Sequence, residues 1–274
     1  MQIRWTLSFF LTVIAYWSAT AQTFRLFLAD LENTTESVLL IDSTAGIVAG
    51  PVFDPRLPIL YYSKGKEIIA FNIESGERNL VFKSDGPVHA LRITPDGKTL
   101  TFLAHLPGNE LKRFALNGGA PAPLAIRNPV ENYIWIDDNN LLVIEPGKPN
   151  TLQLITLRPF RQMTVAKHVG VTLTKVPAMT SFAFVHKLSV DSWSIKTIGT
   201  DGSISILAET PPESDVFAIT STGTPVAFYE SQLHRYNKHT NDWTPIPTRI
   251  QGIITELQPS SGEAKLAFWA KTNQ

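Results

Sequence analysis

Residues 90–104, Ala-Leu-Arg-Ile-Thr-Pro-Asp-Gly-Lys-Thr-Leu-Thr-Phe-Leu-Ala, contain two short apolar segments separated by Pro95-Asp96-Gly97. Proline fixes φ at the first turn position, the Asp side chain can hydrogen-bond nearby backbone groups, and Gly adopts the positive φ that such a turn requires. The stretch therefore predicts two β-strands joined by a tight turn, and the rest of the chain can be compared with this unit.

Segments that resemble this unit recur about every 40 residues. The equivalent apolar strand positions are Tyr62, Phe102, Ile144, Phe184, Phe228 and Phe268. A period of about 40 residues with alternating apolar side chains is typical of propeller blades, each of which is a four-stranded sheet. Helical repeats have a similar period, but the β-branched and aromatic residues and the Pro and Gly between segments favour strands.

The two ends of the chain decide the number of blades. Residues 24–30 and 38–42 predict two strands ahead of the first full repeat, and the chain ends at Gln274, soon after the last repeat. We expect these incomplete ends to form one blade together, because an open ring would leave exposed strand edges. The predicted fold is all-β: a six-bladed β-propeller of four-stranded antiparallel blades over residues 22–274, with one blade closed by N- and C-terminal strands.

Residues 1–21 have the pattern of a secretory signal peptide. Arg4 precedes a mostly apolar run over residues 5–17, and Ala19-Thr20-Ala21 offers an Ala-x-Ala cleavage site. Thirteen helical residues span about 20 Å, which is short of the roughly 30 Å hydrocarbon layer. We therefore expect a periplasmic or secreted protein with no stable membrane insertion.

Composition excludes several classes of function. The chain has 24 basic and 24 acidic residues, so it lacks the positive charge that nucleic-acid binding requires. It has no cysteine, so no disulfide and no thiol nucleophile is available. Gly-x-Ser-x-Gly, Walker and His-Glu-x-x-His motifs are absent from the sequence, which leaves no local signature of a hydrolase, nucleotide or zinc site.

Residues 93–102, followed by 110–119, resemble the WD40-like repeat of TolB-type six-bladed propellers. The resemblance covers the propeller alone, without the α/β domain that precedes it in TolB. Our leading hypothesis is a non-catalytic scaffold, monomeric and without a cofactor, that binds envelope or extracellular proteins or peptides, because the loops and central funnel of a propeller suit such recognition. A purely structural envelope protein differs from this hypothesis only in its partners. Arg92, Tyr133 and Trp135, on innermost strands, are the candidate binding residues at the channel mouth. Two structural alternatives remain: inter-blade packing for the aromatic residues, and an Arg92–Glu256 pair across the ring.

A second functional hypothesis is a metal-dependent lactonase or hydrolase. Six-bladed gluconolactonase-type enzymes hold a divalent cation in the channel, and oxygen ligands suit such ions. Asp54, Asp137 and Glu256 are the candidate ligands for Ca or Zn in this alternative. Asp54 and Asp137 align with Thr94, whereas Glu256 aligns with Arg92, so their side chains need not converge. Turn capping is the structural alternative for these carboxylates, and we favour a protein that is not an enzyme.

Overall fold

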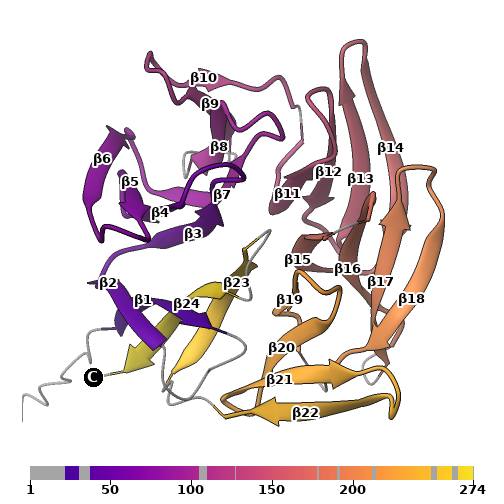
Figure 1. Ribbon diagram of the computed structural model, residues 1–274. Helices are drawn as coiled ribbons and strands as arrows, with labels where there is room; N and C mark the ends of the chain where they lie inside the picture. Colours follow the sequence, from indigo (N-terminus) through magenta and orange to yellow (C-terminus); the bar gives the residue numbers. More distant parts are fainter. Residues whose placement is uncertain are drawn as a thin grey trace, which may run out of the picture.

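Six four-stranded antiparallel sheets are arranged as blades around a central axis (Figure 1). The computed structural model describes residues 22–30, 38–104, 110–126, 128–177, 179–189, 192–211, 214–247, 252–260 and 265–273. These residues confirm the predicted all-β, six-bladed fold. They include no helix of sufficient length and apolar character to cross a membrane. Residues 1–21, with the predicted signal peptide, lie outside the described residues.

Five blades are continuous in sequence, and their strands run outward from the axis in chain order. The first two are β3 (Val48–Phe53), β4 (Ile59–Lys64), β5 (Glu67–Asn72), β6 (Arg78–Lys83) and β7 (Val88–Ile93), β8 (Thr99–Ala104), β9 (Glu110–Ala115), β10 (Ala122–Pro123). The third and fourth are β11 (Asn132–Trp135), β12 (Asn140–Glu145), β13 (Thr151–Leu157), β14 (Phe160–Lys167) and β15 (Val169–Val176), β16 (Ser181–Lys187), β17 (Trp193–Gly199), β18 (Ile204–Glu209). The fifth is β19 (Phe217–Ile219), β20 (Pro225–Tyr229), β21 (Gln232–Asn237), β22 (Asp242–Ile246).

The sixth blade combines both ends of the chain, as predicted. Its strand order is β2 (Val38–Thr44), β1 (Gln22–Asp30), β24 (Lys265–Asn273), β23 (Ile253–Pro259). The pairing of β1 with β24 is unbroken from Gln22↔Asn273 to Asp30↔Lys265, and Figure 1 shows these indigo and yellow strands side by side. The ring is therefore closed by backbone hydrogen bonds between strands at opposite ends of the sequence.

The Pro95-Asp96-Gly97 turn has the predicted geometry. Gly97 has a φ of 65° and donates its N–H to Thr94 O at 2.8 Å, while Asp96 Oδ1 accepts the Lys98 N–H at 3.0 Å. Arg56, from the preceding blade, donates Nη2 to Gly97 O at 2.5 Å. The turn thus joins two strands of one blade and also contacts its neighbour.

The hydrophobic core lies between the blades. The six repeat positions expected from the sequence fall on the second strand of each blade, β4, β8, β12, β16, β20 and β24. One apolar cluster joins Tyr61 and Ile68 of one blade to Leu100 and Phe114 of the next. Because each blade covers its apolar faces with its neighbours, the closed ring is the unit that buries the core.

Candidate functional site

Four of the innermost strands contain a register shift close to the axis. These shifts lie between Ala49 and Val52, His89 and Arg92, Val169 and Leu173, and Ile254 and Glu256. A bulge bends its strand and redirects the next side chain. Arg92 on β7 and Glu256 on β23 are each the first paired residue after such a shift, so the two equivalent positions both present charged groups to the channel.

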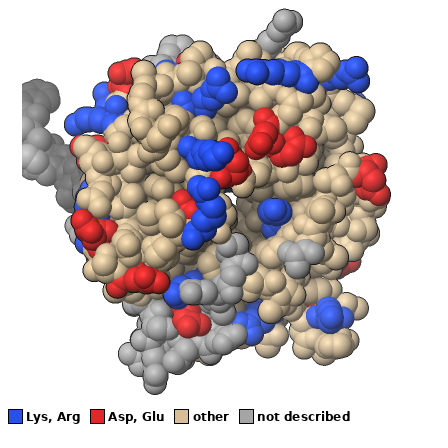
Figure 2. Space-filling model, turned by 45° about the horizontal axis from the view of Figure 1, so that its top comes forward, with Lys and Arg blue, Asp and Glu red and all other residues tan. Residues whose placement is uncertain are grey.

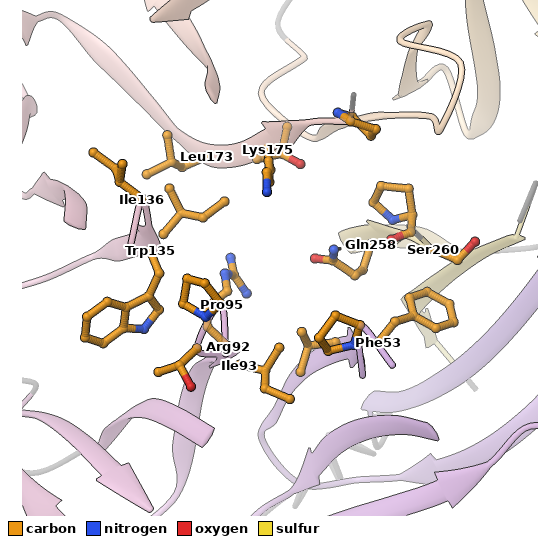
Figure 3. Close-up of a pocket in the computed structure, with 17 residues that line it drawn as sticks. Phe53, Arg92, Ile93, Pro95, Trp135, Ile136, Leu173, Lys175, Gln258 and Ser260 are labelled. Carbon is orange, nitrogen blue, oxygen red and sulfur yellow. Dashed lines mark hydrogen bonds between the residues drawn. The ribbon is translucent and has the colours of Figure 1, made fainter. Parts of the chain in front are cut away.

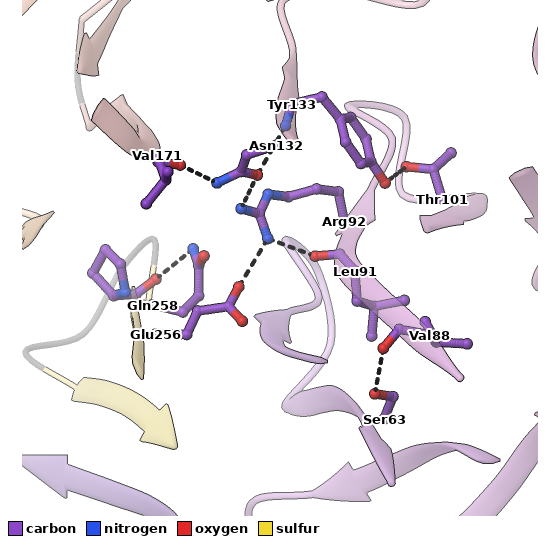
Figure 4. A network of polar contacts seen from close by, with 11 residues as sticks. Ser63, Val88, Leu91, Arg92, Thr101, Asn132, Tyr133, Val171, Glu256 and Gln258 are labelled. Atoms are coloured by element: carbon purple, nitrogen blue, oxygen red, sulfur yellow. Dashed lines mark hydrogen bonds and ion pairs between the residues drawn. The ribbon is translucent and has the colours of Figure 1, made fainter. Parts of the chain in front are cut away.

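Arg92 is the centre of a polar network that crosses the channel (Figure 4). Its guanidinium donates to Leu91 O at 2.7 Å, to Asn132 Oδ1 at 2.9 Å and to Glu256 Oε1 at 3.2 Å. Asn132 in turn donates Nδ2 to Val171 O at 2.9 Å. This chain of bonds links four blades, and the Arg92–Glu256 pair that the sequence suggested is present.

The Arg92–Glu256 ion pair is largely shielded from solvent. The Arg92 side chain is 11% exposed and that of Glu256 is 27% exposed. Burial raises the pKa of Glu256, and the charge and the hydrogen bond of Arg92 partly offset that rise. The carboxylate therefore balances the buried guanidinium, which leaves it poorly placed to serve as a free metal ligand.

Two cavities lie on either side of Arg92, which borders both. The turn-side cavity has a volume of about 340 Å³ and is lined by the ends of β3, β7, β11, β15 and β23. The opposite cavity, of about 280 Å³, is lined mainly by residues at or near the starts of all six innermost strands. Figure 2 shows one face of the ring hollowed at its centre, with basic side chains on both sides of the hollow and acidic ones close by.

The turn-side cavity combines apolar walls with a few polar groups (Figure 3). Trp135, Ile136 and Leu173 form one side, Phe53 lies on the other, and Lys175 and Gln258 point into the space between them. Such a cavity, mostly apolar with a small number of polar groups, is typical of ligand-binding sites. We therefore take it as the candidate site.

The predicted aromatic residues occupy different positions. Tyr133 is fully buried and donates its hydroxyl to Thr101 Oγ1 at 2.9 Å, so it lies in the inter-blade packing that was one of the two alternatives. Trp135 is 7% exposed and also donates to Thr101 Oγ1, through Nε1 at 3.0 Å. Because the indole borders the turn-side cavity, the structure leaves Trp135 and Arg92 as wall residues of that site.

The three candidate metal ligands do not converge. Asp54 Oδ1 accepts the N–H groups of Arg56 and Leu57 at 2.9 and 3.1 Å, and Asp137 Oδ1 accepts those of Asn139 and Asn140 at 2.8 and 2.9 Å. The pKa of Asp137 is lowered: burial alone would raise it, but the hydrogen bonds from Asn140 and Asn139 outweigh that effect. Both residues cap turns, and Glu256 is paired with Arg92. Within the described ranges, no group of three or more His, Cys, Asp or Glu residues is arranged to hold a metal ion.

Sequence reasoning missed three polar residues of the site: Lys175, Gln258 and Asn132. Lys175 lies two residues before Pro177, and Gln258 lies one residue before Pro259; both prolines match Pro95 of the repeat. A comparison of the residues just before each repeated proline would have found them, since that position marks the end of an innermost strand. Asn132 had no such signal, because its role comes from contacts with two other blades.

Comparisons with known proteins identify the fold. No protein-family model and no curated sequence matches the chain. A structure assigned as TolB from Agrobacterium tumefaciens aligns with a TM-score of 0.73 at 10% identity, over 92% of this chain and 99% of that one. TolB from Acinetobacter baumannii gives 0.61 at 15% identity, over 92% and 67%. A gluconolactonase from Xanthomonas campestris gives 0.61 at 12% identity, over 89% of each chain. At these identities the similarity shows the propeller fold alone, and at that level the resemblance to TolB is confirmed.

Proposed function

We propose that this chain is an exported TolB-like propeller that acts as a non-catalytic protein- or peptide-binding module in the cell envelope or outside the cell. The observation that carries the proposal is the turn-side cavity, whose wall is assembled from five blades and combines apolar side chains with Lys175 and Gln258. Propeller loops present such a cavity on a rigid support, which suits recognition of a partner. The apolar run over residues 5–17 supports export, and the near-neutral charge supports a protein that does not bind nucleic acid.

The alternative, a metal-dependent lactonase with Ca or Zn in the channel, has less support from the geometry. The similarity to a gluconolactonase is a similarity of fold. Each carboxylate that the alternative would use already has another partner, as described above for Asp54, Asp137 and Glu256. We therefore assign these residues to turn capping and charge balance.

Capture of partners from an envelope extract tests the proposal. The immobilised protein would be residues 22–274, with Gln258→Trp as a variant that fills the turn-side cavity. The matched control is Lys66→Trp. Lys66 lies in the β4–β5 turn, which joins the second and third strands of its blade and is therefore on the face of the ring opposite the turn-side cavity. We expect the wild type and Lys66→Trp to capture the same partners from the extract, and Gln258→Trp to lose them. Equal capture by all three proteins, or none by any, would contradict binding at this cavity.

A further inference from the structure

The turn-side cavity has a positive charge that nothing in the described part of the chain balances. Arg92 and Lys175 are the two charged residues in its wall, and Arg92 is paired with Glu256. Lys175 is an exposed residue near the end of β15, and its side chain makes no ion pair or hydrogen bond with any described residue. Figure 3 shows its side chain directed into the cavity. The site therefore favours an anion.

The surroundings of this charge define the rest of the ligand. Trp135, Leu173 and Phe53 give the cavity apolar walls, and attraction between opposite charges is stronger beside such walls than in open water. The Gln258 amide donates to Pro259 O at 3.4 Å, a long bond that a ligand can replace. These features fit a carboxylate that is attached to an apolar group.

The small volume of the cavity, and the Arg92 bonds that cross the channel on its inner side, favour the end of a chain over a segment that passes through. On its inner side the bonds from Arg92 to Asn132 and to Glu256 cross the channel, whereas exposed Pro95 and Lys175 lie at the rim. The volume of about 340 Å³ is near the lower end of the range, about 300–1,000 Å³, that is usual for ligand sites. A terminal residue can enter such a space while the preceding residues leave along the rim.

We propose that the turn-side cavity binds the free carboxyl terminus of a peptide whose last residue is apolar, with Lys175 as the partner of the carboxylate. The inference rests on the proposed binding function and specifies the chemistry of the partner. The last side chain contacts the Trp135 and Leu173 wall, and the Gln258 amide bonds the terminal carboxylate or the peptide group before it.

Titration calorimetry with three probes tests this assignment: acetyl-Gly-Gly-Ala-Phe with a free carboxylate, the same peptide as its amide, and octanoate. The proteins are residues 22–274 as wild type, Lys175→Met, and Lys66→Met as an exposed lysine control outside the cavity. We expect the free acid to bind the wild type and Lys66→Met equally. Loss of one charge-assisted hydrogen bond predicts that the amide, or the Lys175→Met protein, binds about tenfold more weakly or worse.

Several results would overturn the assignment. Equal affinity for acid and amide, an unchanged affinity in Lys175→Met with an unchanged melting temperature, or no binding of any probe at millimolar concentration would each do so. Binding of octanoate without the peptide would make the cavity a site for small organic acids. A captured partner that Gln258→Trp abolishes but Lys175→Met leaves intact would overturn the carboxylate assignment while the proposed function stands.

Discussion

Replacement of Arg92 by Met tests whether the channel network stabilises the ring. The guanidinium makes three hydrogen bonds and its side chain is 11% exposed, so the variant leaves Glu256 without its cation and Asn132 without one donor. Removing one partner of a buried ion pair costs about 3–5 kcal/mol. Because Glu256 keeps 27% of its side-chain surface exposed, we expect the lower end, about 3 kcal/mol. At about 2–4 °C per kcal/mol for a chain of this size, the melting temperature should fall by about 6–12 °C.

The pH dependence separates this mechanism from a simple loss of packing. In the folded protein the pKa of Glu256 is raised above its ordinary value of 4.5. Protonation of Glu256 therefore contributes to the free energy of unfolding at low pH, and this contribution is lost as the pH rises through the raised pKa. Loss of Arg92 raises the pKa further. The cost of Arg92→Met should therefore be larger at pH 8 than at pH 4.5.

Calorimetric melts of four variants provide the measurement: R92M, E256Q, R92M/E256Q and the exposed control Arg161→Met on β14. In the double variant no buried carboxylate remains without a cation, so it should be more stable than R92M alone at pH 8. Arg161→Met should change stability by less than about 0.5 kcal/mol. A cost of R92M that does not depend on pH, or strictly additive effects in the double variant, would refute the reasoning.

Three further predictions concern the ring and its metal content. Deletion of residues 22–44 removes β1 and β2 and exposes the edge of β24, so size-exclusion chromatography should show aggregates; a soluble monomer with the parent melting temperature would mean that the closing blade is dispensable. Gly97→Ala should destabilise the protein more than Gly223→Ala does in thermal melts. Both glycines have positive φ, but a Cβ at Gly97 would lie 2.7 Å from the Arg56 guanidinium, which would have to move away and lose its hydrogen bond to Gly97 O, whereas Gly223 has open space. Elemental analysis of the purified protein should find Ca and Zn well below one ion per chain, and one tightly held ion that is lost on replacing Asp54, Asp137 or Glu256 would restore the lactonase hypothesis.

Most of the fold could be predicted from the sequence because the repeat unit is local. The Pro95-Asp96-Gly97 turn and the alternating apolar residues around it depend on neighbours in the chain, and period-2 alternation specifies which strand faces are buried. The closing blade could be predicted for a related reason. Once five complete repeats are counted, the strands at the two ends are each half of a blade, and pairing them leaves no open edge.

The site was predicted only in part, because its residues are brought together by the bulges of the innermost strands. Arg92 and Glu256 could be matched since both hold the same position in their repeats, and an ion pair between them was one of the possibilities. Tyr133 and Trp135 differ by two residues and share one face of β11, yet one is fully buried and the other borders the cavity. The alternation of residues along a strand predicts which face of the sheet a side chain lies on, but how deeply that side chain is buried depends on the packing of the next blade.

The residues that build the ring and those that build the site are therefore separate sets. Apolar positions such as Phe102 and Phe184 recur from blade to blade, because each blade must offer the same packing surface to its neighbour. A six-fold repeat of one charged residue would place like charges around the axis, where they repel one another. Arg92 and Glu256 hold equivalent positions with opposite charges, and Lys175 introduces a cation into one blade. Differences between blades at the axis thus make a specific cavity possible, and these positions are the ones in which functional divergence among propellers of this fold should be sought.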